Sequence, residues 1–167
     1  MDYDLSTVRI GTENFDCPID DRWFEDYRVG AVYEYGHVEV TEAQIVHYAN
    51  IYDPQSIHTN PGTAEDGPFK GLIASGWQTA SIFMRIFVDH YLTAVGSLAS
   101  PGIDELRWTA PVRPGDRLWV RITVEGKRLS NSKPDRGIVT TTGEMFNSGH
   151  TKVLSLRAMN MIAIRPE

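Results

Sequence analysis

The sequence has little of several features that mark specialised classes of protein. It contains one cysteine, Cys17, so no disulfide can form within the chain, and this favours a reducing cytoplasm. No apolar run approaches the roughly 18 to 20 residues that span a bilayer, and the acidic N-terminus has no apolar stretch of the kind found in secretory signals. We therefore expect a cytoplasmic protein that does not interact with a membrane.

An excess of positive charge is also missing. Lysine and arginine number 16 and aspartate and glutamate 22, which gives a formal net charge of -6. Proteins that bind nucleic acid normally carry a basic excess, because they neutralise phosphates. We therefore expect no nucleic-acid partner. A small anionic ligand stays open, because it needs only a local group of basic side chains.

The rest of the composition is that of an ordinary folded domain. The chain has 167 residues, of which 41% are hydrophobic and 23% charged, and these values are typical of one globular domain. At this length roughly 70% of the surface of the unfolded chain can be buried, so the core needs no disulfide or metal. Residues 1–25 show no clear periodicity of apolar residues, and we expect them to form an N-terminal arm beside a single domain at 26–167.

Two helices are predicted in the first two thirds of the chain. The first begins at a capping box, in which the side chains of Thr41 and Gln44 each bond the backbone N–H of the other residue. It ends near Tyr52, because a proline two residues later disfavours the helical conformation. The second helix is expected over about residues 75–93. Its apolar residues cover most of the circumference, which is typical of a buried helix.

Strands are predicted on both sides of these helices. In residues 31–40 apolar and polar side chains partly alternate, which indicates a strand. Four further candidate strands follow the second helix, at 103–110, 117–128, 138–146 and 151–164. Because the strands cluster after the helix, the fold class is expected to be α+β, with an antiparallel sheet of about five strands around one long buried helix. Such a sheet leaves open edges, so we expect a homodimer or higher homo-oligomer.

The segment between the two helices carries the strongest candidates for chemistry. Residues 53–71 hold three prolines and three glycines, and long irregular loops of this kind are commonly functional. Asp53 and His58 lie five residues apart within it, and a carboxylate held near an imidazole can share proton transfer. The alternative is that Asp53 only caps the loop and that His58 only bonds a backbone carbonyl.

Ser75 and Gly76 stand where the second helix should begin. The first N–H groups of a helix have no partner within it, and the helix dipole favours negative charge there. A glycine also lets a ligand approach the backbone, so the position suits an oxyanion site for an enolate-like intermediate. The alternative is an ordinary N-cap serine followed by a glycine that allows tight packing. The histidines and Cys17 show no metal-ligand spacing, so no metal site is expected.

Three separate segments resemble a known family. In order and spacing, FEDYRVGAVYEYGHVEVTEAQIVHYANIYDPQSIH, FKGLIASGWQTAS and ELRWTAPVRPGD are similar to the MaoC-like dehydratases, the family of (R)-specific enoyl-CoA hydratases. This resemblance implies the hotdog fold, in which an antiparallel sheet wraps a long helix and the domain pairs as a dimer. It also implies a coenzyme A or acyl-carrier thioester substrate, a place in fatty acid metabolism and no cofactor.

The resemblance also implies catalytic roles for particular residues. Asp53 and His58 match the catalytic pair in the family motif Asp-x-Asn-Pro-x-His, while Gln55 replaces the usual Asn and Ser56 the usual Pro. Gly76 matches the glycine whose backbone N–H serves as the oxyanion donor. The expected catalytic residues are therefore Asp53, His58 and Gly76.

Substrate-binding residues follow from the same resemblance. Ser75 replaces a histidine that the family often has before its glycine. The thioester carrier is strongly anionic, so a local basic patch is needed, and Lys70 and Arg107 lie in segments that flank the site motifs. The alternative is that these are solvated surface charges. The expected substrate-binding residues are Gln55, Ser75, Lys70 and Arg107.

The resulting functional prediction is an enoyl-CoA hydratase or acyl dehydratase, which is a carbon–oxygen lyase. It would convert a trans-2-enoyl-CoA, or a related acyl thioester, reversibly to the (R)-3-hydroxyacyl thioester. Two alternatives stay open. A hotdog thioesterase would direct water at the carbonyl carbon instead. A non-catalytic module would only hold acyl thioesters, and the departures at Gln55, Ser56 and Ser75 are what favour it.

Overall fold

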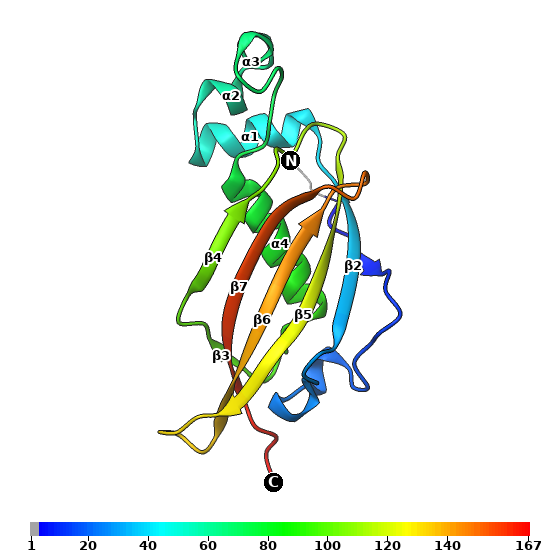
Figure 1. Cartoon of the computed structure of the whole chain (residues 1–167), viewed down its shortest axis with the longest axis vertical. Helices are drawn as coiled ribbons and strands as arrows, with labels where there is room; N and C mark the ends of the chain where they lie inside the picture. The colour runs from blue at the N-terminus through cyan, green and yellow to red at the C-terminus, as the bar shows by residue number, and fades with distance from the viewer. Residues whose placement is uncertain (1–3) are drawn as a thin grey trace.

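A curved antiparallel sheet wraps one long helix in the computed structural model, which describes residues 4–167 (Figure 1). The five longer strands are those predicted, and two short strands join them. The strands are β1 (Val8–Arg9), β2 (Val32–Glu39), β3 (Ser97–Ala99), β4 (Ile103–Trp108), β5 (Arg117–Leu129), β6 (Arg136–Phe146) and β7 (Lys152–Ala163). Their order is β1-β2-β5-β6-β7-β3, and β4 also pairs with β7. Every pairing is antiparallel, which confirms the predicted α+β class.

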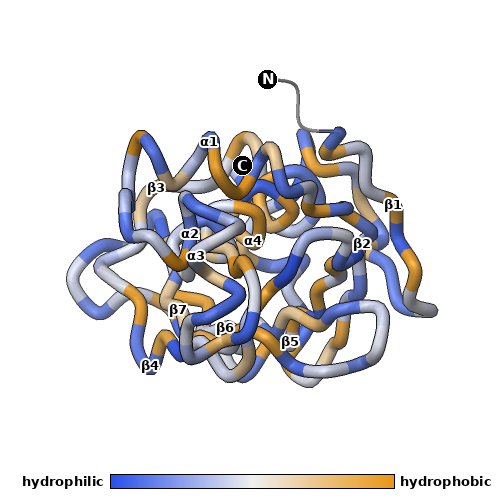
Figure 2. Tube along the Cα trace, turned by 90° about the horizontal axis from the view of Figure 1, so that it is seen from above, coloured by the Kyte–Doolittle hydropathy of each residue, from blue (hydrophilic) through white to orange (hydrophobic). Residues whose placement is uncertain are grey.

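The alternation in β5 places one face of the sheet against the core. The apolar residues at alternate positions, from Leu118 to Val124, are fully buried. Trp119 departs from this pattern, because it is buried on the other face, where its ring stacks on Phe146 at 4.6 Å. Figure 2 shows β4, β7, β6, β5 and β2 following one another around α4 (Gly76–His90), so the concave face of the sheet holds the helix.

The first predicted helix is confirmed as α1 (Glu42–Tyr52). The Thr41 Oγ1 accepts from the Gln44 N–H at 3.3 Å, and the Gln44 Oε1 accepts from the Thr41 N–H at 2.9 Å. The second helix, α4, ends at His90, earlier than expected. The Arg22 guanidinium donates to the carbonyls of His90 and Tyr91 at 2.7 and 2.8 Å, and so gives the last turn partners from outside the helix.

Helix α4 is buried on one side, whereas its apolar pattern predicted burial over most of its circumference. Among the described residues the sheet covers one side of the helix, and Trp77, Met84 and Val88 keep 57%, 49% and 44% of their surface exposed. On the buried side, Gly143 of β6 lies against the ring of Phe83, and a side chain there would collide with it. None of the helices formed by residues 4–167 is both long enough and apolar enough to cross a membrane.

The segment at 53–71 is more ordered than its prolines and glycines suggested. It contains α2 (Ser56–Thr59) and α3 (Pro61–Asp66), so the prediction of an irregular loop was partly wrong. The Asn60 side chain accepts from the Thr63 N–H at 3.2 Å and caps α3. Pro61 occupies the first turn of α3, where its missing N–H has no consequence.

The described part of the predicted N-terminal arm lies on the sheet and enters the core. Strand β1 pairs with β2, and two short 3-10 helices follow at η1 (Ile19–Asp21) and η2 (Phe24–Asp26). Phe15 is buried and stacks on Tyr33 at 4.2 Å, and the Arg22 guanidinium lies 3.5 Å from the centre of its ring. Residues 1–3 of the arm lie outside the described residues, and the boundary after residue 25 stays a prediction.

Candidate active site

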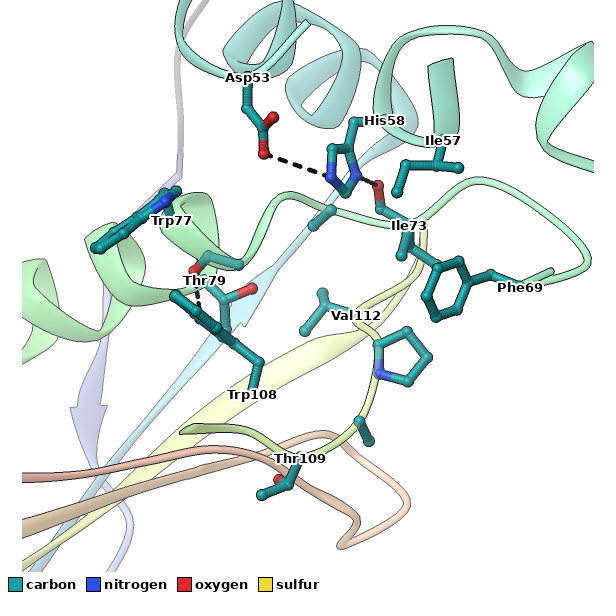
Figure 3. Close-up of a pocket in the computed structure, with 14 residues that line it drawn as sticks. Asp53, Ile57, His58, Phe69, Ile73, Trp77, Thr79, Trp108, Thr109 and Val112 are labelled. Atoms are coloured by element: carbon teal, nitrogen blue, oxygen red, sulfur yellow. Dashed lines mark hydrogen bonds and ion pairs between the residues drawn. The ribbon is translucent and has the colours of Figure 1, made fainter. Parts of the chain in front are cut away.

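A pocket of about 420 Å³ opens between α1, α2, the start of α4 and the end of β4 (Figure 3). Asp53, His58 and Gly76, the three residues predicted to be catalytic, all line it. The remaining walls are largely apolar. Figure 3 shows Phe69, Ile73 and Val112 on one side of the pocket and Trp77 and Trp108 on the other.

Asp53 caps the C-terminal end of α1, which carries its carboxylate to the edge of the pocket. Its Oδ1 accepts from the Gln55 Nε2 at 2.7 Å, and its Oδ2 accepts from the Ser75 Oγ at 2.7 Å. These two hydrogen bonds, that of Gln55 first, hold the pKa of Asp53 below its ordinary value, although burial opposes them. Asp53 is therefore a carboxylate at neutral pH.

His58 lies on α2 and is buried. Its Nδ1 is 2.8 Å from the carbonyl oxygen of Ile73, and since a carbonyl can only accept, the Nδ1 carries a hydrogen. The other ring nitrogen, Nε2, faces the Asp53 Oδ2 at 3.4 Å. The ring is thereby oriented so that Nε2 is the atom that can exchange a proton with a ligand in the pocket.

Ser75 and Gly76 begin α4 as predicted. The Ser75 hydroxyl is fully buried, accepts from the Trp77 N–H at 3.2 Å and donates to Asp53. The Gly76 N–H makes no hydrogen bond to another residue within 4–167. Because the first N–H groups of a helix favour negative charge, the Gly76 N–H can stabilise an oxyanion in the pocket.

The other predicted binding residues lie outside the pocket. Gln55 and Ser75 donate hydrogen bonds to Asp53 and do not line the pocket themselves. Lys70 and Arg107 are exposed and do not line it, so their role in binding the carrier stays a prediction. Arg113 is closer, because its Nη2 donates to the carbonyl of Phe69 at 2.6 Å, and Phe69 is part of the wall.

Sequence reasoning missed the wall residues, Trp108 above all. The Trp108 Nε1 donates to the Gly76 carbonyl at 2.7 Å, and the two residues are far apart in the chain. The only signal in the sequence is an aromatic residue at the end of a strand, just before a proline-rich turn. As for metals, no three His, Cys, Asp or Glu side chains in the described part of the chain are grouped so as to hold an ion.

Comparison with known proteins gives a family. The model described as the MaoC-like domain matches residues 26–144. Among curated proteins, the uncharacterized protein YdeM of Bacillus subtilis is 26% identical over 129 residues, which cover 77% of this chain and 90% of YdeM. The 3-hydroxyacyl-thioester dehydratase Z of Mycobacterium tuberculosis is 29% identical over 113 residues, covering 66% of this chain and 75% of that protein.

Solved structures agree with this result. The MaoC-like dehydratase from Rhodospirillum rubrum is 37% identical, with a TM-score of 0.82, and the match covers 87% of this chain and 99% of that one. A double hotdog protein from Mycobacterium tuberculosis is 17% identical, with a TM-score of 0.75, over 90% of this chain and 47% of that one. At that identity the likeness shows the fold alone, and it confirms the hotdog architecture.

Proposed function

Since this chain belongs to the MaoC-like domain family, we propose that it adds water reversibly to a trans-2-enoyl thioester, carried on coenzyme A or an acyl carrier, to give the (R)-3-hydroxyacyl thioester. The observation that carries the proposal is the meeting of three groups in one pocket. They are the Asp53 carboxylate, the His58 Nε2 at 3.4 Å from it, and the N-terminus of α4 at Gly76. The similarity to a MaoC-like dehydratase and to a 3-hydroxyacyl-thioester dehydratase supports the reaction class.

The reaction follows from the placement of these groups. The thioester carbonyl oxygen accepts from the Gly76 N–H, and the apolar walls cover the acyl group. Asp53 and His58 hold one water beside C3. The oxygen of this water bonds to C3 as the double-bond electrons move to form an enolate, whose charge lies at the Gly76 N–H. One hydrogen of the water passes to the pair, and the pair returns a proton to C2. Dehydration is the reverse.

The hydrogen bonds of Asp53 and His58 support different roles for the two residues in the reaction. Two donors hold the pKa of Asp53 below its ordinary value, which makes it a weak base. Imidazole is the side chain that commonly exchanges protons near neutral pH. We therefore assign proton transfer to the His58 Nε2. In this assignment Asp53 orients the water and stabilises the imidazolium that forms.

The test is the loss of conjugated enoyl absorbance with short, medium and branched trans-2-enoyl-CoAs. Asp53→Asn and His58→Gln should each lower kcat/KM by about 100- to 10,000-fold, the range for a lost general acid–base. Asp89→Asn is the matched control, because its ion pair with Arg85 lies on the helix surface away from the pocket, and it should keep wild-type activity.

Product analysis separates this proposal from its alternatives. A 3-hydroxyacyl thioester of R configuration supports it. Free thiol would identify a thioesterase, and tight acyl-CoA binding without any product would identify a binding module. Either of these two results, or wild-type activity in both variants, would refute the proposal.

A homodimer is part of the proposal. Within the described residues β4 pairs only with β7, so its other edge is open, and Ile103 on this strand keeps 52% of its surface exposed. An open strand edge with exposed apolar side chains is suited to pairing with a second copy. Ile103→Lys should reduce the mass measured by sedimentation from dimer to monomer, and a wild-type monomer would contradict this.

We also propose that the protein is located in a reducing cytoplasm. The free thiol of Cys17 supports this location.

A further inference from the structure

Trp108 and Gly76 contact each other at the N-terminal end of α4. The indole Nε1 donates to the Gly76 carbonyl at 2.7 Å. A Cβ at position 76 would lie 2.6 to 2.7 Å from three atoms of the same indole, closer than real Cβ atoms come to a neighbour. Only glycine therefore lets the ring lie against the backbone here. The ring is itself held by an edge-to-face contact with Trp77 at 5.2 Å between centroids.

The backbone at Gly76 needs such support. Glycine is the most permissive residue in backbone conformation, and it stands in the first turn of the helix, where helices fray. The Gly76 N–H belongs to the Ser75–Gly76 peptide, whose carbonyl accepts from the Thr79 N–H at 3.1 Å and from the Thr79 Oγ1 at 3.3 Å. The Ser75 side chain bonds the N–H of Trp77, so the carbonyl of Gly76 is the group left to a partner from another element. A useful oxyanion donor must stay about 2.7 to 3.1 Å from the position that the charged oxygen will occupy. The bond from Trp108 is the contact that restrains the Gly76 carbonyl from outside the helix.

We propose that Trp108 is a positioning residue, whose indole packs against Gly76 and binds its carbonyl, and so restrains the backbone torsions that aim the Gly76 N–H into the pocket. The inference rests on the proposed function for its catalytic consequence, because the oxygen to be stabilised is that of the thioester. Its structural content, a restraint on the backbone torsions of Gly76, stands on the geometry alone. Trp108 acts through Gly76 and does not exchange protons.

The first test compares Trp108→Phe with Trp23→Phe. Phenylalanine keeps a ring against Gly76 but removes the N–H donor. The Trp23 Nε1 likewise donates one hydrogen bond, to the Asp21 Oδ1 at 3.0 Å, but η2 lies at the far end of the sheet from α2 (Figure 1). Trp23→Phe is therefore the same chemical change away from the pocket, and it should keep wild-type activity.

We expect Trp108→Phe to lower kcat about ten-fold, a part of the roughly 100- to 1,000-fold lost with a whole oxyanion donor. Because the enolate needs the donor more than the ground state does, KM and the Kd of butyryl-CoA should change less than about two-fold. The stoichiometry of butyryl-CoA binding should equal that of wild type, which shows that the folded fraction is unchanged. A kcat equal to wild type, or no lower than that of Trp23→Phe, would overturn the proposal.

A second measurement does not depend on turnover. The ¹⁵N order parameter of the Gly76 amide should fall in Trp108→Phe from a rigid value near 0.85 toward the flexible range below about 0.6, and stay unchanged in Trp23→Phe. If wild type hydrates no thioester, the proposed function fails. The order parameter then decides the positioning role alone, and an unchanged value in Trp108→Phe overturns it.

Discussion

Replacement of Ser75 by alanine should affect both the stability and the pH dependence of this protein. The Ser75 hydroxyl is buried and joins two parts of the site, since it accepts from the N–H of Trp77 and donates to the Asp53 Oδ2. Ser75→Ala removes both bonds and leaves the Trp77 N–H and an Asp53 carboxylate oxygen each without one partner. Ser75→Thr keeps the hydroxyl and is the conservative comparison.

The expected loss of stability is the sum of two contributions. An N-cap serine contributes about 1 kcal/mol. A hydrogen bond to a charged group contributes about 1.5 to 3 kcal/mol, and we take the lower end because water can reach the partly exposed carboxylate. The free energy of unfolding should therefore fall by about 2.5 kcal/mol at neutral pH. For a domain of this size, that lowers Tm by about 5 to 10 °C.

The pH dependence separates the two contributions. The pKa of Asp53 lies below its ordinary value in the folded protein, so its stabilising effect is present above the pKa of an unfolded aspartate and is lost as pH falls through the folded pKa. In acid both proteins carry a neutral Asp53, and the difference between them should shrink to the cap contribution of about 1 kcal/mol. The acidic limb of the kcat/KM profile should also move to higher pH in Ser75→Ala.

Chemical unfolding at several pH values measures this difference. Ser81→Ala provides the control, because its hydroxyl donates to the carbonyl of Trp77 and has otherwise a long contact of 3.4 Å with the Tyr48 hydroxyl, and because it is exposed, so its effect should stay within about 0.5 kcal/mol. If Ser75→Ala lost the same stability in acid as at neutral pH, the hydrogen bond to Asp53 would contribute nothing, and the share of Ser75 in lowering the pKa of Asp53 would be refuted.

Three further predictions concern the site and the core. Gln55→Ala removes the first donor on Asp53, so the acidic limb of kcat/KM should move to higher pH, and a limb that does not move would contradict this. Gly143→Ala should destabilise by about 1 to 3 kcal/mol in urea unfolding, because its Cβ meets an aromatic ring of α4, whereas Gly126→Ala has open space and should be neutral. Arg22→Met should lower the free energy of unfolding by about 1.5 to 3 kcal/mol, because two carbonyls at the end of α4 lose a charged donor, and a neutral result would contradict this.

The elements that the sequence predicted well have local causes. Helix α1 begins at Thr41 because the capping box needs only residues three apart. The alternation of β5 needs only neighbouring residues and a buried face, and the apolar side chains at its alternate positions, from Leu118 to Val124, are the buried ones. In both cases the pattern and the structure depend on the same short stretch of chain.

The elements that the sequence predicted poorly depend on distant partners or are too short for a pattern. Helix α2 has four residues, fewer than the periodicity of a helix needs to show, and it formed in a segment rich in proline and glycine. The end of α4 depends on Arg22, which is 68 residues away in sequence. The exposed flank of α4 reflects how far the sheet wraps, and no property of the helix alone decides that.

For the site, the sequence by itself determined the residue types and their spacing, Asp53 and His58 before a helix that starts at Gly76, and with them the resemblance to a family. Only the tertiary structure decided which atoms meet. It placed the Ser75 hydroxyl on Asp53 across 22 residues and the Trp108 indole on Gly76 across 32. The physical reason is that a hydrogen bond requires a donor and an acceptor within a few tenths of an ångström and a narrow range of angles. Spacing along a chain restricts such geometry only between near neighbours, whereas packing of the sheet around α4 sets it for residues that are far apart.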